Sequence, residues 1–187
     1  PRFVSDNSTA INRQLQDRDQ VDDILANQTD LTARFQTGGA RHALVTGVEV
    51  SRETNERHRL IASPAPLADL YNPDPSQPFS GSVTRSGAKT DVTADSVGVY
   101  AFDTVSLGER WEIPLGVRWD SFAVDSEDQA VTGTVTALDR TDRMGSGRGG
   151  LVFKPRPEGS IYAGYGNSFN PAGEGFVLSN AVAHAAN

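Results

Sequence analysis

The residues of this chain best suited to acid–base or metal chemistry are its three histidines, His42, His58 and His184. They lie far apart in the sequence and no pair has H-x-x-x-H spacing, so a metal held by histidine is not expected. The chain has no cysteine, which excludes thiolate ligands and thiol nucleophiles. No G-x-S-x-G motif marks a serine nucleophile, although a Ser-His-Asp triad is a spatial arrangement that sequence does not exclude. His58, two residues from Glu56, is the best candidate for a general base, and a solvated loop histidine is the favoured interpretation.

A group of carboxylates near the start of the chain is the other candidate for cation binding. It consists of Asp17, Asp19, Asp22 and Asp23. The group lacks the glycine that a 12-residue calcium loop needs at its sixth position, so a solvated acidic segment is expected instead. The sequence therefore predicts no catalytic residue, no metal site and no cofactor.

The secondary-structure elements that position these residues belong to a polar and acidic chain. The 187 residues are 37% hydrophobic, with a formal net charge of −7 and a mean hydropathy of −0.42. No run of about 18 apolar residues occurs, which excludes a transmembrane helix but not a membrane β-barrel, because barrel strands alternate apolar and polar residues. The 17 cationic side chains form no basic stripe, so nucleic acid is not an expected partner.

The strongest periodic signal lies at residues 111–119, where Trp, Ile, Leu, Val and Trp alternate with Glu, Pro, Gly and Arg. Alternation over nine residues predicts a β-strand, about as long as a tilted strand needs to cross a bilayer. Trp111 and Trp119 stand at its two ends, as aromatic residues do where an outer-membrane strand meets the two interfaces. In a soluble sandwich the same row would face a core.

Further alternating segments predict three hairpins with short turns. They are residues 31–36 and 44–50 around 37–39, residues 96–107 and 111–119 around 107–110, and residues 144–153 and 160–169 around the proline-containing 154–159. Long polar connections at 53–89 and 125–141 separate the hairpins, and only 13–25 and the alanine-rich 181–186 suggest helix. Short periplasmic turns alternate with long extracellular loops in outer-membrane barrels, whereas such connections are unusual in a compact soluble domain. The sequence therefore predicts an all-β, antiparallel up-and-down meander of the outer-membrane β-barrel type, a fragment of about six strands with long loops.

Three blocks of sequence resemble consecutive barrel segments of TonB-dependent siderophore receptors, nearest to those for catecholate-type ferric siderophores. They are "NQTDLTARFQTGGARHALVTGVEVSRE", "ADSVGVYAFDTVSLGERWEIPLGVRWDSF" and "GLVFKPRPEGSIYAGYGNSFNP". The resemblance spans residues 21–178 and leaves 179–187 as a non-matching tail, so residues 1–187 are interpreted as a single partial barrel segment. It implies a plugged barrel of about 22 strands in the outer membrane of a Gram-negative cell. Such a receptor captures an iron chelate and imports it with energy delivered by TonB.

Several sequence features of this receptor family have no counterpart in the chain. Nothing matches the amino-terminal plug or the segment that binds TonB, and the aromatic-terminated final strand of the family is missing. A middle fragment or a truncated reading frame is therefore expected. Import by this chain alone is implausible, because six strands leave two open edges whose unpaired backbone groups are costly in lipid.

The resemblance also gives a ligand-binding role to arginines and aromatic residues of the first long connection. They are Arg57, Arg59, Tyr71, Phe79 and Arg85. Guanidinium groups pair with catecholate oxygens and stack on aromatic rings, which suits an anionic aromatic chelate. The ferric siderophore is then the transported ligand and not a cofactor. The other implied partners are outer-membrane lipid and TonB, the latter only through the missing plug region.

Two alternatives stay open from the sequence. The first is a small soluble β-barrel that binds a ligand or self-assembles after truncation of a receptor. The second is a fragment with an acquired hydrolase activity, with His58 or His184 as the base.

Overall fold

The computed structural model describes residues 2–3 and 9–172, and the regular elements among them are all β-strands. No helix within these residues is long and apolar enough to cross a membrane. In chain order the strands are β1 (Arg2–Phe3), β2 (Ala10–Asn12), β3 (Asp19–Thr37), β4 (Ala40–Ala62), β5 (Ala68–Asp69), β6 (Val83–Leu107), β7 (Trp111–Gln129), β8 (Val135–Arg156) and β9 (Gly159–Gly166).

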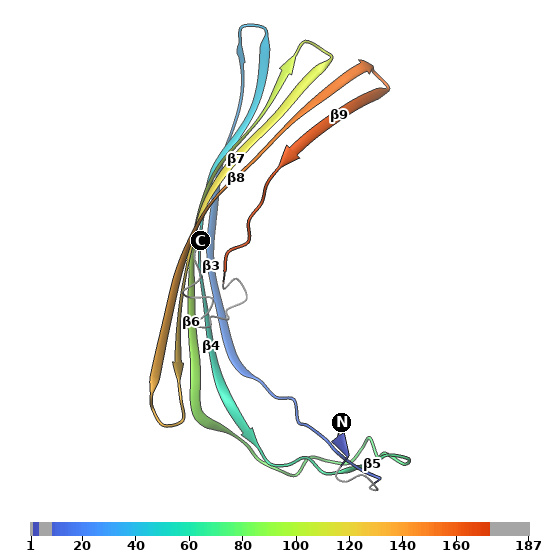
Figure 1. Ribbon diagram of the computed structural model, residues 1–187, viewed down its shortest axis with the longest axis vertical. Coiled ribbons are helices and arrows are strands. Elements are labelled where there is room, and N and C mark those ends of the chain that lie inside the picture. Colours follow the sequence, from blue (N-terminus) through green and yellow to red (C-terminus); the bar gives the residue numbers. More distant parts are fainter. Residues whose placement is uncertain (1, 4–8, 173–187) are drawn as a thin grey trace. The chain divides into compact units, whose positions relative to one another are not determined.

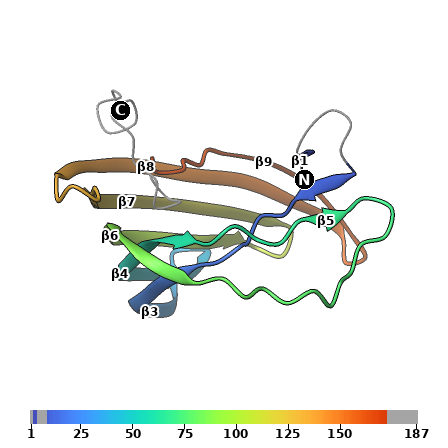
Figure 2. The same cartoon turned by 90° about the horizontal axis from the view of Figure 1, so that it is seen from below.

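The six long strands form one sheet in the order β3-β4-β6-β7-β8-β9, and the short strands form a second sheet in the order β1-β2-β5. The labels in Figure 2 follow the same order across the larger sheet. Strands β8 and β9 are antiparallel, with Arg148 opposite Gly166 and Phe153 opposite Ile161. Each long strand is hydrogen-bonded to the next one along the chain, as a meander requires. The predicted all-β architecture of about six strands is confirmed.

Glycines with a left-handed backbone form two of the tight turns. Gly38 joins β3 to β4 with a φ of 59°, and Gly108 joins β6 to β7 with a φ of 63°. Side chains with a Cβ rarely adopt this conformation, so glycine favours the turn at both positions. A third turn at residues 157–158 joins β8 to β9. All three turns lie where the sequence predicts hairpins.

The strands are longer than the sequence predicts, and two predicted loops are largely wrong. Strand β4 continues to Ala62 and β6 begins at Val83, so only residues 63–82 connect them. The connection predicted at 125–141 shrinks to the few residues between Gln129 and Val135. Hydrogen bonds to neighbouring strands can stabilise a polar strand that has no apolar face. Such a strand shows no hydrophobic alternation, so the sequence pattern does not predict it.

The helix predicted at 13–25 is also wrong, because β3 begins at Asp19 and the residues just before it have no regular structure. Sheet neighbours override a weak local preference in this segment. The predicted helix at 181–186 and the proposed tail 179–187 lie outside the described residues. The description of 1–187 as a single segment stays a prediction.

The chain divides into two compact units, and most of the long strands contribute to both. The first unit is Pro1–Val21, Glu56–Asp91 and Glu127–Thr136, and the second is Asp22–Asn55, Val92–Ser126 and Ala137–Asn187. The second unit holds a small core of Val92, Ala94 and Val124, against which Phe122 packs. Val92 is 2% exposed and Val124 is 1% exposed. The core is small because a single sheet has no second layer to cover it.

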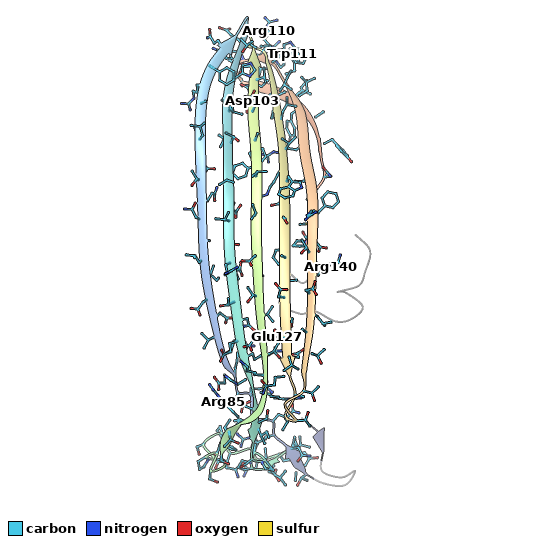
Figure 3. The ribbon with its side chains drawn as sticks, turned by 90° about the vertical axis from the view of Figure 1, so that its left-hand side faces the viewer. Arg85, Asp103, Arg110, Trp111, Glu127 and Arg140 are labelled. Carbon is cyan, nitrogen blue, oxygen red and sulfur yellow. The ribbon has the colours of Figure 1, made fainter. Side chains whose placement is uncertain are left out.

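The two faces of β7 in the second unit differ in chemistry. Trp111, Leu115, Val117 and Trp119 are exposed, whereas Gly116 between them is buried and Arg118 is half-buried. Side chains alternate between the faces of a strand, so both tryptophans lie on one apolar face. Trp111 lies at the turn end of β7 (Figure 3) and stacks on Phe153 with ring centroids 4.4 Å apart. The predicted strand at 111–119, with its tryptophans on one face, is confirmed.

Candidate functional site

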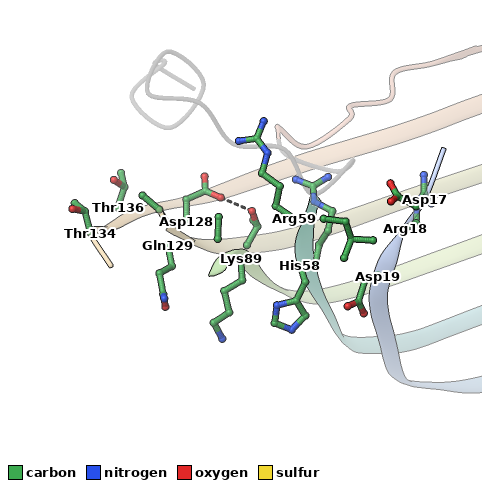
Figure 4. A pocket seen from close by; sticks show the side chains of 15 residues that line it. Asp17, Arg18, Asp19, His58, Arg59, Lys89, Asp128, Gln129, Thr134 and Thr136 are labelled. Carbon is green, nitrogen blue, oxygen red and sulfur yellow. Dashed lines mark hydrogen bonds between the residues drawn. The ribbon is translucent and has the colours of Figure 1, made fainter. Parts of the chain in front are cut away.

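A cavity of about 640 Å³ in the first unit is lined by both acidic and basic side chains. Figure 4 shows it from close by. Its walls come from strands β3, β4, β6, β7 and β8, from the residues before β3 and from the turn between β7 and β8. Its lining consists of Asp17, Arg18, Asp19, Arg57, His58, Arg59, Leu60, Ala88, Lys89, Thr90, Asp128, Gln129, Ala130, Thr134 and Thr136. Neighbouring strands of a sheet bring these distant residues together.

Several of the charges in and beside the cavity are already paired. Arg85 donates two hydrogen bonds to Asp19, of 2.7 and 3.2 Å. These bonds lower the pKa of Asp19 and raise the pKa of Arg85. Lys89 lies 2.7 Å from Asp91, which raises the pKa of Lys89. The hydroxyl of Thr90 donates to Asp128 at 2.5 Å. The positive charges of Arg85 and Lys89 are thus largely neutralised within the chain.

Arg57 and Arg59 differ from these paired groups. Both lie on β4, are exposed and line the cavity. Within residues 9–172 no hydrogen bond or ion pair holds either guanidinium group. Residues i and i+2 of a strand point to the same face, so the two groups stand side by side on one face of β4. A guanidinium presents a planar fork of donors that matches two oxygens of an anion.

The two aromatic residues predicted to bind ligand do not line this cavity. Tyr71 is 81% exposed in the connection between β4 and β6. Phe79 is half-buried in the same connection, where a Cβ on Gly81 would lie 2.6 Å from its Cζ atom and from Ser63 Cβ. The structure therefore brings Arg57 and Arg59 together in the cavity lining and places Arg85 against Asp19 at the cavity wall. The rings of Tyr71 and Phe79 do not line the cavity. The ligand-binding role of all five residues stays a prediction.

Sequence reasoning missed the cavity residues contributed by β6, β7 and the turn after β7. Asp128 and Gln129 lie in a segment that the sequence assigns to a loop, and Thr90 directly follows the other predicted loop. No motif marks them, because their proximity comes from strand pairing over 38 residues between Thr90 and Asp128. Only an alternation of apolar and polar residues could have predicted that these residues belong to neighbouring strands, and this alternation is weak in polar segments.

His42 and His58, the two histidines among the described residues, each lie beside a carboxylate. His58 Nε2 lies 2.8 Å from Glu56. His42 Nδ1 lies 2.6 Å from Asp103, and its ring stacks on Phe35 with centroids 4.7 Å apart. Within the described residues no three His, Cys, Asp or Glu side chains are grouped to hold a metal ion. His184 lies outside the described residues.

The second unit carries a polar network on the side of β7 opposite its tryptophans. Arg118 lies 3.0 Å from Glu49 and 2.7 Å from Asp120. Its guanidinium carbon stands 5.5 Å from the ring centroid of Tyr100. The Tyr100 hydroxyl donates to Asp30 and accepts a hydrogen bond from Gln28 of β3. The sheet is therefore amphipathic, with an apolar row on one face and hydrogen-bonded charges on the other.

An amphipathic antiparallel sheet of this kind is typical of a membrane barrel wall, and comparison with known families decides which one. A family model described as "TonB dependent receptor-like, beta-barrel" matches residues 2–185. The chain belongs to the TonB-dependent receptors.

Relatives of this receptor chain support the assignment. It is 35% identical over 173 residues to a probable TonB-dependent receptor, BfrD, of Bordetella pertussis, an alignment that covers 82% of this chain and 23% of that protein. It is 29% identical over 193 residues to the catecholate siderophore receptor Fiu of Escherichia coli, covering 92% of this chain and 25% of Fiu. The chain spans about a quarter of the length of these relatives.

Solved structures give the same result for the fold. The closed form of the ferric-catecholate import receptor Fiu from Escherichia coli K12 superimposes with a TM-score of 0.76 at 28% identity, covering 87% of this chain and 26% of that one. The resemblance to TonB-dependent siderophore receptors expected from the sequence is confirmed. The relatives are receptors and not enzymes.

Proposed function

We propose that this chain forms part of the wall and loops of an outer-membrane TonB-dependent receptor that binds and imports a ferric siderophore. The family match and the similarity to proteins named as catecholate siderophore receptors support this function. The observation that carries it is the amphipathic sheet of the second unit. An apolar row bounded by Trp111 and Trp119 suits lipid, and the Arg118 network suits a polar barrel interior.

The ligand of this receptor is proposed to be an anionic ferric chelate that contacts Arg57 and Arg59. Catecholate oxygens carry negative charge and lie in pairs, which fits the two donors of a guanidinium fork. The cavity volume of about 640 Å³ lies within the range of small-molecule sites. Arg85 acts mainly by neutralising Asp19, which would otherwise repel an anion from the cavity wall. Tyr71 and Phe79 are proposed to approach the ligand from the connection between β4 and β6.

TonB is the proposed energy source, reached through a plug segment that this chain does not match. The proposed location is the outer membrane of a Gram-negative cell. No catalytic role is proposed for any residue, since the relatives are receptors.

Iron uptake in cells tests this function. Cells that carry a membrane-embedded receptor containing this chain are expected to accumulate radioactive iron from iron(III) 2,3-dihydroxybenzoate, and deletion of TonB is expected to abolish the accumulation. Fractionation of the same cells tests the soluble alternative. Uptake that does not depend on TonB would contradict the proposal, as would a protein that is monodisperse in buffer without detergent.

A further inference from the structure

The connection between β4 and β6, here called loop 63–82, is held by specific hydrogen bonds and not only by its two ends. At its base the Ser63 amide donates to the Ser82 carbonyl at 2.9 Å, and the Ser82 amide donates to the Ser63 hydroxyl at 3.1 Å. The Phe79 ring lies across the same base, against Gly81. The loop is therefore closed where it leaves the sheet.

Loop 63–82 is also joined to a second segment, residues 9–14, which precedes β3. Strand β2 pairs with β5, with Ala10 opposite Asp69. The Leu70 amide donates to the Thr9 carbonyl at 2.8 Å. Arg13 donates to the Gln77 side chain at 3.2 Å. Four separate contacts, including one at Asp69 described next, thus cross between segment 9–14 and the loop.

Asp69 is the point where the contacts within the loop and between the two segments meet. One carboxylate oxygen accepts the amides of Tyr71 and Asn72 at 2.8 and 2.9 Å. The other oxygen accepts the Thr9 hydroxyl at 3.3 Å. The amide hydrogen bonds from Asn72 and Tyr71 lower the pKa of Asp69, as expected for an ionised acceptor.

Tyr71 follows this junction and presents its ring to solvent. Its amide is fixed by Asp69, while its side chain is 81% exposed. An exposed aromatic ring on an ordered backbone loses little conformational entropy when it contacts a ligand. This combination distinguishes Tyr71 from an exposed residue on an unrestrained loop.

We propose that Asp69 is a positioning residue that joins segment 9–14 to loop 63–82 and holds Tyr71 where it contacts the siderophore. The contact between Tyr71 and ligand rests on the proposed function, whereas the joining of the two segments does not. Asp69 acts through the backbone amides and does not itself contact the ligand.

Asp74 provides a matched control within the same loop. Its carboxylate accepts the amide and the hydroxyl of Ser76 at 2.9 and 2.6 Å, and these bonds also lower its pKa. Both of these contacts stay within loop 63–82. Removal of this carboxylate therefore disturbs one turn and a charge interaction with Arg13, and it leaves the hydrogen bonds between the loop and segment 9–14 in place.

The first measurement is amide hydrogen exchange on the intact membrane-embedded protein. Asp69→Ala is expected to accelerate exchange at Tyr71 and Asn72 by roughly fivefold each, the effect of losing one hydrogen bond. Exchange is also expected to accelerate at Leu70, because its amide donates to the Thr9 carbonyl and Thr9 loses its side-chain bond to Asp69. Asp69→Asn keeps a carbonyl acceptor and is expected to restore most of the protection. Asp74→Ala is expected to accelerate exchange only at Ser76. Unchanged exchange at Leu70 and Tyr71 in Asp69→Ala would overturn the positioning role, whatever the ligand does.

The second measurement is the Kd for iron(III) 2,3-dihydroxybenzoate. Asp69→Ala and Tyr71→Ala are each expected to raise the Kd by roughly fivefold, and the double variant by no more than either single change. Asp74→Ala is expected to leave the Kd within about twofold of wild type. If Tyr71→Ala weakens binding and Asp69→Ala does not, the positioning role is overturned. If neither affects binding but exchange accelerates, the joining of the segments stands and the ligand contact of Tyr71 is overturned.

Discussion

The clearest prediction concerns Arg57 and Arg59, two of the unpaired arginines that line the cavity. Replacement of Arg57 and Arg59 by alanine together removes two guanidinium groups that no other described side chain neutralises. An exposed charge-assisted contact contributes about 1 kcal/mol, toward the upper end of the range for exposed ion pairs, because solvent screens it. Two such contacts correspond to roughly a 20- to 30-fold rise in Kd if they act independently. Each single variant is expected to weaken binding by roughly fivefold.

The assay is equilibrium binding of radioactive iron(III) 2,3-dihydroxybenzoate to outer membranes that contain the protein. Arg52→Ala is the matched control, because Arg52 lies on the same strand but outside the cavity. Its Nε and Nη2 atoms donate to the two carboxylate oxygens of Asp95, at 2.7 and 2.8 Å. This control is expected to bind ligand as wild type does. The difference between the double variant and the control should shrink as salt concentration rises, since salt screens exposed charges.

Two outcomes would refute this reasoning. Equal loss of binding in Arg52→Ala and in the double variant would show that net charge, and not the cavity, attracts the ligand. Unchanged binding in the double variant would show that the ligand does not contact β4 at this point. Immunodetection of each variant in the outer membrane separates loss of binding from loss of protein.

Three further predictions concern packing, lipid contact and pH. Gly47→Ala is expected to lower the free energy of unfolding in detergent by about 1–3 kcal/mol. The added Cβ would lie 2.6 Å from the hydroxyl oxygen of the buried Tyr100 on β6. Gly39→Ala, whose Cβ meets nothing within 4 Å, is the control, and equal thermal midpoints for the two variants would contradict the packing argument. Val117→Arg is expected to destabilise the membrane-inserted protein by about 2–4 kcal/mol, as judged by urea unfolding in vesicles. Val131→Arg, at a position equally exposed but in a turn, should unfold as wild type does, and similar losses for both would argue against lipid contact. The lowered pKa of Asp19 in the folded state means that its ion pair stabilises the fold above the ordinary pKa of 3.8 and loses this effect as the pH falls through the lowered value. The protection factor against hydrogen exchange at the start of β3 should therefore stay constant around neutral pH and fall only in strong acid, and a fall near pH 6 would contradict this assignment.

The sequence was most informative where one face of a strand is apolar. Alternation at residues 111–119 placed β7 and its tryptophan face, because burial against lipid or protein imposes a period of two on the side chains. Gly38 and Gly108 marked two turns, since both adopt a left-handed backbone. These local signals were enough to predict the order and approximate number of the long strands.

The sequence was least informative where strands are polar on both faces. The sequence assigns the end of β4 and the start of β6 to a loop, because their side chains give no apolar alternation. The same absence hid the cavity, whose lining comes from several strands. Arg57 and Arg59 could be selected only through the family resemblance, and the pairing of Arg85 with Asp19 required the three-dimensional arrangement.

Contacts between adjacent turns have a consequence for strand register in this sheet. Arg41 donates to the Gly108 carbonyl at 3.2 Å, and the Lys154 amide donates to the Arg110 carbonyl at 2.7 Å. These two bonds tie the β3–β4 and β8–β9 hairpins to the hairpin of β6 and β7. A slip of one residue would break them at the same time as it turned Trp111 and its apolar row toward the interior. The turn contacts therefore disfavour a shifted register at the turn end of the hairpins.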